Sequence, residues 1–174
     1  MLGCRSDKEN LNQMIGTIHV VFAIAALLIG AVVAFRPKGG RRHRILGYFY
    51  VIFLLSVNVS ALSVYEEAVG MGPFHILAVI SLVTLISGFI PAFLRRPVSS
   101  WLDLHAYFIS WSYVGLVAAG IAQIVTMSSS LPAQFTVGLP SILVVLIGGV
   151  LIHTRVPKIL AGLGSGRRQP NKVH

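Results

Sequence analysis

Five long runs of apolar residues follow one another along the chain, each bounded by charged residues, glycine or proline. A helix needs roughly 20 apolar residues to cross the ~30 Å hydrocarbon layer of a membrane, and every run has about that length. The pattern therefore predicts an all-α fold, a polytopic transmembrane bundle of five helices in which the first four form the core. The predicted helices cover residues 14–35, 45–65, 73–94, 102–127 and 134–153.

Basic residues alternate between the connections. Residues 36–44 hold five Lys or Arg, the third connection holds Arg95 and Arg96, and the segment after the fifth run holds five more. The second connection carries Glu66 and Glu67 without a basic residue, and the fourth has no charge. By the positive-inside rule, this alternation predicts an N-terminus outside and a C-terminus in the cytoplasm.

The composition supports a membrane protein and excludes several other classes. Hydrophobic residues make up 55% of the 174 residues and charged residues 11%, against about 25% charged in a typical soluble domain. The net charge of +9 lies in short connections, so nucleic-acid binding is not predicted. A single cysteine, Cys4, allows no internal disulfide. We expect one transmembrane domain over residues 1–156 and a disordered, basic cytoplasmic tail over residues 157–174.

Four histidines lie within or beside the predicted helices, where ionisable side chains are functional candidates by default. In the predicted orientation His19 and His75 lie near the outer surface, on the first and third helices, and are called the outer pair. His43 and His105 lie near the cytoplasmic surface, on the second and fourth helices, and are called the inner pair. One imidazole from each of two helices is the usual way to hold a b-type haem.

Small residues follow His19 at helical spacing, at Ala23, Ala26 and Gly30. This stripe fits the flat face of a porphyrin, but it equally fits a neighbouring helix, because Ala26, Gly30 and Ala34 form a small-xxx-small pattern. Exposure between Arg42 and Arg44 makes His43 a weaker ligand candidate than His19, so the outer pair is the favoured site.

Two other interpretations use the same residues. Glu66, Glu67 and His75, with His19 nearby, carry the oxygen and nitrogen ligands that a divalent metal such as zinc accepts. Alternatively, the histidines serve helix packing or face lipid headgroups, which we favour for His43 and His153. Ser56, Ser60 and Ser63 share one face of the second helix and are expected to bond to a neighbouring helix, and Asn58 is expected to join helices in the same way.

The histidine positions resemble those of a known group of proteins. His19, the segment HRILGYFY at residues 43–50, Phe74 with His75, and His105 are similar to small bacterial membrane proteins catalogued as a domain of unknown function. The resemblance covers roughly residues 16–120 and implies a multi-pass protein of the bacterial cytoplasmic (inner) membrane with a four-helix core, without an established activity. The spacing also resembles that of double-haem transmembrane cytochromes b, which usually have six helices.

These features lead to a functional hypothesis. The chain is a b-type haem protein for transmembrane electron transfer, with one or two haems held by His19 with His75 and by His43 with His105. This makes it an electron carrier or membrane oxidoreductase, with the lipid bilayer, a redox protein or quinone, and a second copy of the chain as expected partners. The alternative is a non-redox transporter or accessory subunit whose histidines bind a divalent metal or serve packing.

Overall fold

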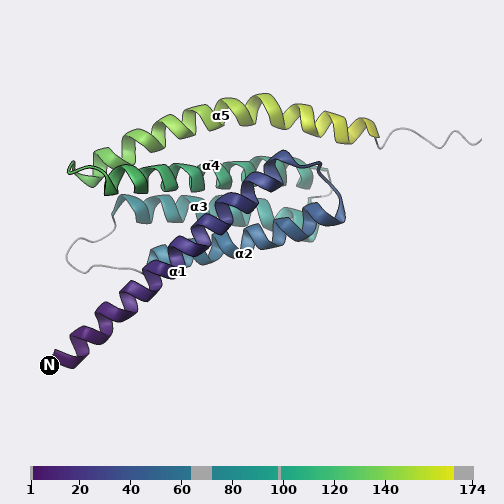
Figure 1. The fold of residues 1–174 in the computed structure, drawn as a ribbon. Coiled ribbons are helices and arrows are strands. Elements are labelled where there is room, and N and C mark those ends of the chain that lie inside the picture. The colour runs from purple at the N-terminus through teal and green to yellow at the C-terminus, as the bar shows by residue number, and fades with distance from the viewer. Residues whose placement is uncertain (1, 64–71, 98, 167–174) are drawn as a thin grey trace, which may run out of the picture.

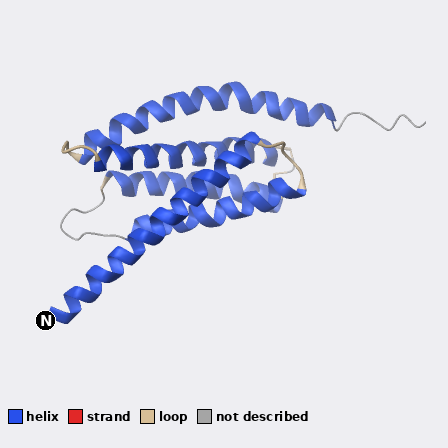
Figure 2. Ribbon diagram, in the orientation of Figure 1, coloured by secondary structure: helices blue, strands red, loops and turns tan. Residues whose placement is uncertain are grey.

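The computed structural model describes residues 2–63, 72–97 and 99–166, and side-chain positions within them from residue 10 to residue 163. The described residues form five helices and connecting loops (Figures 1 and 2). The helices are α1 (Leu2–Phe35), α2 (Arg41–Ser63), α3 (Pro73–Leu94), α4 (Trp101–Met127) and α5 (Ala133–Gly166). All five contain a stretch long and apolar enough to cross a membrane, so the predicted fold is confirmed.

The helices extend beyond the predicted limits at three places. α1 begins at Leu2 rather than at residue 14, although its apolar span is Asn10–Phe35. α2 begins at Arg41, which brings His43 into its first turn. α5 continues through Pro157 to Gly166, so residues 157–166 are helical rather than disordered as expected. A proline removes one backbone hydrogen bond from a long ladder, which a helix can tolerate.

Neighbouring helices in the chain run in opposite directions and pack side by side. The closest pairs are α4 with α5, α3 with α4, and α1 with α2, with a smaller contact between α2 and α3. α1 crosses the bundle diagonally and its first turns project beyond it (Figure 1). The connection between α1 and α2, the start of α4 and the end of α5 lie at the same end of the bundle. Because this end collects Lys38, Arg41 to Arg44, Arg95, Arg96, Arg155 and Lys158, we call it the basic end.

The exterior of the bundle is apolar and its interior holds several polar groups. Large hydrophobic side chains such as Leu28, Phe93 and Leu146 are about two-thirds exposed. Asn58, Ser81, Ser112 and other hydroxyl side chains are buried instead. This inversion of the soluble pattern is expected where the surrounding solvent is lipid. The chain is a multi-pass membrane protein.

Glycines allow close approach between helices at three interfaces. A Cβ added at Gly30 of α1 would lie 2.5 Å from the ring of Tyr113 and 2.9 Å from that of Tyr50. At Gly88 of α3, the added atom would lie 2.8 Å from the backbone nitrogen of Ile109, and at Gly148 of α5 it would meet Val114 at 2.6 Å. Helix packing therefore occupies the small-residue stripe of α1 at Gly30, which supports the packing interpretation of the stripe at that position.

Candidate histidine sites

The two histidines of the inner pair lie at the same end of the bundle, the basic end. α2 and α4 run in the same direction, and His43 and His105 both lie in their first or second turn (Figure 1). His43 lies within range of the charges of both His105 and Lys38. The pairing of these two histidines from helices two positions apart stays a prediction.

A hydrogen bond deeper in the bundle joins the helices that carry the inner pair. Tyr50 lies two helical turns after His43, and Ser112 lies two turns after His105. The hydroxyl oxygens of Tyr50 and Ser112 are 3.0 Å apart, and Tyr50 is only 2% exposed. Because the two intervals are equal and the helices run in the same direction, both histidines lie about two turns from the residues of this bond, toward the basic end. Sequence reasoning missed it, although the equal spacing was visible.

The ring of His105 has a fixed orientation. Its Nδ1 lies 3.0 Å from the carbonyl oxygen of Gly88 on α3. A carbonyl oxygen only accepts hydrogen bonds, so Nδ1 carries the proton and donates it. In the neutral ring Nε2 then keeps its lone pair, which is the arrangement found in histidines that bind metals. The sequence gives no signal for Gly88 as the partner, because the contact depends on the close packing of α3 on α4.

His43 is half-buried, and its Nδ1 is buried without a hydrogen-bond partner among the described residues. A buried polar nitrogen without a partner is uncommon and calls for a physical explanation. Arg42 and Arg44 are exposed on either side, so His43 turns inward while its neighbours point outward. The expected exposure of His43 is thus wrong for its imidazole.

Lys38 lies beside the inner pair in the connection between α1 and α2. Its Nζ donates hydrogen bonds to the carbonyl oxygens of Val33 at 2.7 Å and Ala34 at 2.6 Å, at the C-terminal end of α1. Partial burial lowers the pKa of Lys38 below its ordinary value of 10.5. A cation at this position stabilises the free carbonyl groups of the helix end.

The outer pair is arranged differently. Nδ1 of His19 lies 2.8 Å from Oγ of Ser60 on α2. Ser60 donates its own proton to the carbonyl oxygen of Val57, at 3.0 Å, so Nδ1 of His19 is the donor in the first bond. His19 thus joins α1 to α2. The expected bond from the serine face to a neighbouring helix is confirmed at Ser60, whereas Ser56 and Ser63 bond to carbonyl groups of their own helix.

His75 closes the first turn of α3. The backbone N–H of Gly72 donates to Nδ1 of His75 at 3.3 Å, so this ring nitrogen accepts a hydrogen bond. α1 and α3 are not among the closely packed helix pairs of the described residues, and neither are α2 and α4. Glu66 and Glu67 lie outside the described residues, so the alternative metal site there stays a prediction. Among residues whose side chains are described, no group of three or more His, Cys, Asp or Glu gathers to hold a metal.

His153 differs from the other histidines. It is exposed on α5, and its Nδ1 lies 3.1 Å from the carbonyl oxygen of Gly149 in the preceding turn. Its ring lies 6.2 Å from that of Tyr107, in an edge-on arrangement. Since it makes contacts at the helix surface, it serves as a control position for experiments on the other histidines.

Comparison with known proteins identifies the family. Residues 16–161 match DUF2306, which is described as a predicted membrane protein. The chain belongs to this family. The DUF2306 match confirms the resemblance to a membrane family of unknown function and extends beyond the expected residues 16–120 into α5. No curated protein and no protein of solved structure matches the chain. The resemblance to double-haem cytochromes b therefore receives no support from these comparisons.

Proposed function

We propose that this DUF2306 protein is a b-type haem protein for electron transfer across the membrane, with His43 and His105 as the haem ligands at the basic end. The observation that carries the proposal is the hydrogen bonding of the two imidazole rings. His105 is oriented by the Gly88 carbonyl with Nε2 left as an acceptor, and His43, at the same end of the bundle, has a buried Nδ1 without a hydrogen-bond partner among the described residues. A histidine binds haem iron through a ring nitrogen whose lone pair is not used in a hydrogen bond.

The surroundings of the inner pair fit a porphyrin. Gly47 lies one turn after His43, and a Cβ added there would meet nothing within 4 Å, so the helix surface is open at this position. Arg41, Arg42 and Arg44 supply positive charge for carboxylate groups of the cofactor. When bound, haem supplies one-electron transfer. The chain joins the two ligand-bearing helices through the Tyr50–Ser112 hydrogen bond and excludes water with the apolar residues around it.

The hydrogen bonds favour the inner pair over the outer pair that the sequence favours. His19 donates Nδ1–H to Ser60, which leaves Nε2 available, but Nδ1 of its expected partner His75 accepts a bond from Gly72, so in the neutral ring Nε2 of His75 carries the proton. The proposal therefore relies on one haem at the inner pair, and a second haem at the outer pair has weaker support.

The proposed orientation places the basic end in the cytoplasm, in the cytoplasmic membrane of a bacterium. This follows from the positive-inside rule, since nine Lys or Arg residues of the described chain, from Arg36 to Lys158, lie in or beside the connections at that end. A haem near that surface would exchange electrons with a cytoplasmic or membrane partner.

An absorption spectrum tests the proposal. The full chain is purified from haem-supplemented cells, and the spectrum is recorded before and after dithionite reduction. We expect a Soret band that shifts on reduction and is lost in His43→Ala and in His105→Ala. The matched control His153→Ala removes an exposed histidine and keeps the wild-type spectrum. A colourless wild-type protein with full helicity would overturn the proposal.

A second candidate function, a non-redox subunit in which the histidines join helices, is favoured by two observations. His19 bonds α1 to α2, and His105 bonds α4 to α3. The variant His105→Asn separates the candidates, because an asparagine amide N–H can replace Nδ1–H while no imidazole remains. The haem proposal expects a folded variant without a Soret band. The second candidate expects colourless protein throughout, with His105→Asn more stable than His105→Ala.

A further inference from the structure

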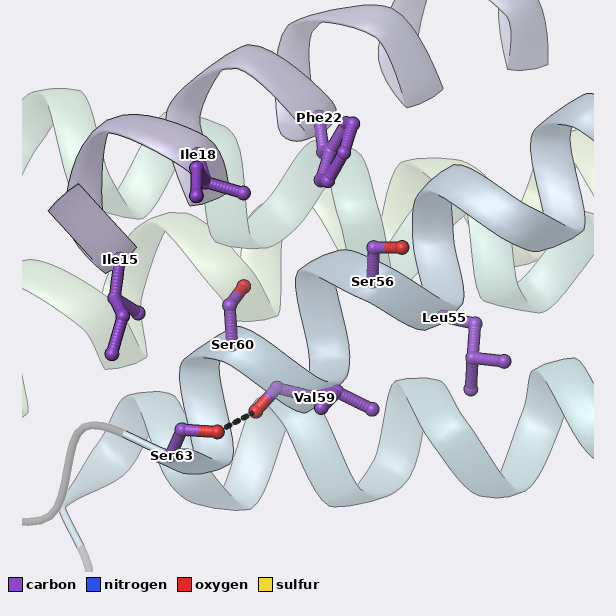
Figure 3. A pocket seen from close by; sticks show the side chains of 8 residues that line it. All are labelled: Ile15, Ile18, Phe22, Leu55, Ser56, Val59, Ser60 and Ser63. Atoms are coloured by element: carbon purple, nitrogen blue, oxygen red, sulfur yellow. Dashed lines mark hydrogen bonds between the residues drawn. The ribbon is translucent and has the colours of Figure 1, made fainter.

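A groove of about 400 Å³ runs between α1 and α2, on the side away from the basic end (Figure 3). Its two walls differ in chemistry. The α1 wall is apolar and consists of Ile15, Ile18 and Phe22, which project toward α2. The α2 wall alternates Leu55 and Val59 with three serines. Because several lining side chains are exposed, the groove opens toward the surrounding lipid.

The serine wall offers hydrogen-bond acceptors. The hydroxyl groups of Ser56, Ser60 and Ser63 donate to carbonyl oxygens of their own helix, at 3.0, 3.0 and 2.8 Å. Each serine proton is therefore committed, and the lone pairs of the oxygens remain. Ser60 also accepts the Nδ1–H of His19. A ligand that brings carbonyl oxygens finds no donor on this wall, whereas a ligand that brings O–H groups finds acceptors.

The spacing of the serine oxygens indicates which ligands with O–H groups fit the groove. Ser56 and Ser60 are one helical turn apart, a rise of about 6 Å, which is comparable to the separation of the two oxygens across a quinol ring. Phe22 provides an aromatic face for such a ring, and it packs against Phe53 with centroids 5.6 Å apart. Ile15 and Ile18 continue the apolar wall for a hydrocarbon tail.

We propose that this groove binds a lipid-soluble quinol, which donates its ring hydroxyl groups to Ser56 and Ser60 and lays its ring against Phe22. The site goes beyond the proposed haem function, and its occupancy requires no haem. It lies at the end of the bundle opposite the inner pair, next to the His19–Ser60 bond.

Binding is measured by anaerobic titration of the full chain in lipid nanodiscs. The probes are a decyl-benzoquinol kept reduced, its dimethyl ether, which has the same shape without O–H groups, and the oxidised quinone. We expect the quinol to bind at least tenfold more tightly than the other two, because two hydrogen bonds of about 1 kcal/mol each are lost in them. Equal binding of quinol and dimethyl ether overturns the proposal.

Serine variants locate the site. Ser56→Ala removes one acceptor without disturbing His19, and we expect about fivefold weaker quinol binding. Ser128→Ala is the matched control, because Ser128 is exposed on the end of α4 and bonds in the same way to the carbonyl of Ile124. Wild-type affinity in Ser56→Ala, or displacement of the quinol by an equal concentration of diacylglycerol, contradicts a quinol site in this groove.

Discussion

Tyr50 and Ser112 join α2 to α4 through hydroxyl oxygens 3.0 Å apart, in a part of the bundle where both side chains are almost fully buried. Ser112 also donates to the carbonyl oxygen of Ile109, at 2.8 Å, so its proton is committed and Tyr50 is the donor between the two helices. A substitution of Tyr50 therefore removes the donor of this bond, whereas a substitution of Ser112 removes its acceptor.

The loss of the Tyr50 hydroxyl and the loss of the Ser112 hydroxyl should therefore lower the free energy of unfolding by different amounts. Tyr50→Phe loses one donor and leaves Ser112 bonded to Ile109, so we expect the free energy of unfolding to fall by about 0.5–1 kcal/mol. Ser112→Ala leaves the buried Tyr50 hydroxyl without its acceptor and should lower it by about 1–3 kcal/mol. Denaturant titration in detergent micelles measures both. A larger loss in Tyr50→Phe than in Ser112→Ala contradicts the assigned direction.

Gly30 and Gly16 lie on the same helix and should respond oppositely to alanine. At Gly30 the new methyl group would lie 2.5 Å from the Tyr113 ring, and that ring is held by a 3.2 Å bond from its hydroxyl to the Leu27 carbonyl. We expect a loss of about 1–3 kcal/mol from overpacking. At Gly16 nothing lies within 4 Å, so alanine should be neutral or stabilise by up to about 1 kcal/mol. Thermal unfolding of both variants provides the comparison, and equal effects would contradict the packing at Gly30.

Much of the fold could be predicted from hydropathy alone, because lipid imposes one requirement on every spanning segment. The ends at Phe35, Leu94 and Met127 agree with the predicted ends. The misplaced start of α1 has a physical cause: hydropathy detects the apolar run from residue 14, whereas the helix continues into the polar residues before it. The tail was expected to be disordered from Pro157, but α5 continues through this proline because a helix tolerates the loss of one backbone hydrogen bond.

The candidate sites were only partly predictable. Helical order and direction were enough to place His43 and His105 at the same end of the bundle. The state of each ring was not, because it depends on particular partners from other helices, the Gly88 carbonyl for His105 and Ser60 for His19. The small-residue stripe fitted both a porphyrin and a helix until packing placed Tyr113 and Tyr50 against Gly30.

The native cysteine allows a direct test of the orientation. Cys4 precedes the apolar span Asn10–Phe35, so the proposed topology places it outside the cell. A membrane-impermeant maleimide should label the wild-type chain on intact cells. The matched control is Cys4→Ser combined with Arg96→Cys at the basic end, which should be labelled only after the membrane is permeabilised. The reverse pattern would falsify the proposed orientation.

Lys38 should give the stability a specific pH dependence. Because burial lowers its pKa in the folded state below 10.5, the unfolded chain binds more protons in the interval just below that value. The contribution of Lys38 to the free energy of unfolding therefore increases as the pH rises through this interval and is constant below it. The variant Lys38→Met lacks this pH-dependent contribution to the free energy of unfolding. The stability difference, wild type minus variant, should grow between neutral pH and pH 10.5, and a flat or falling difference contradicts the burial of Lys38.

The bond between His19 and Ser60 should stabilise the attachment of α1 to α2. In His19→Ala the donor is lost, and we expect the free energy of unfolding to fall by about 0.5–1.5 kcal/mol. His19→Asn places an amide N–H near the position of Nδ1 and should restore most of this loss, because Ser60 needs a donor and not an imidazole. The double variant His19→Ala with Ser60→Ala should lose less stability than the sum of the losses in the two single variants, because both substitutions remove the same bond. Denaturant titration of the wild type and the four variants (His19→Ala, His19→Asn, Ser60→Ala and the double variant) measures these losses. If His19→Asn is as unstable as His19→Ala, the imidazole contributes something other than this hydrogen bond.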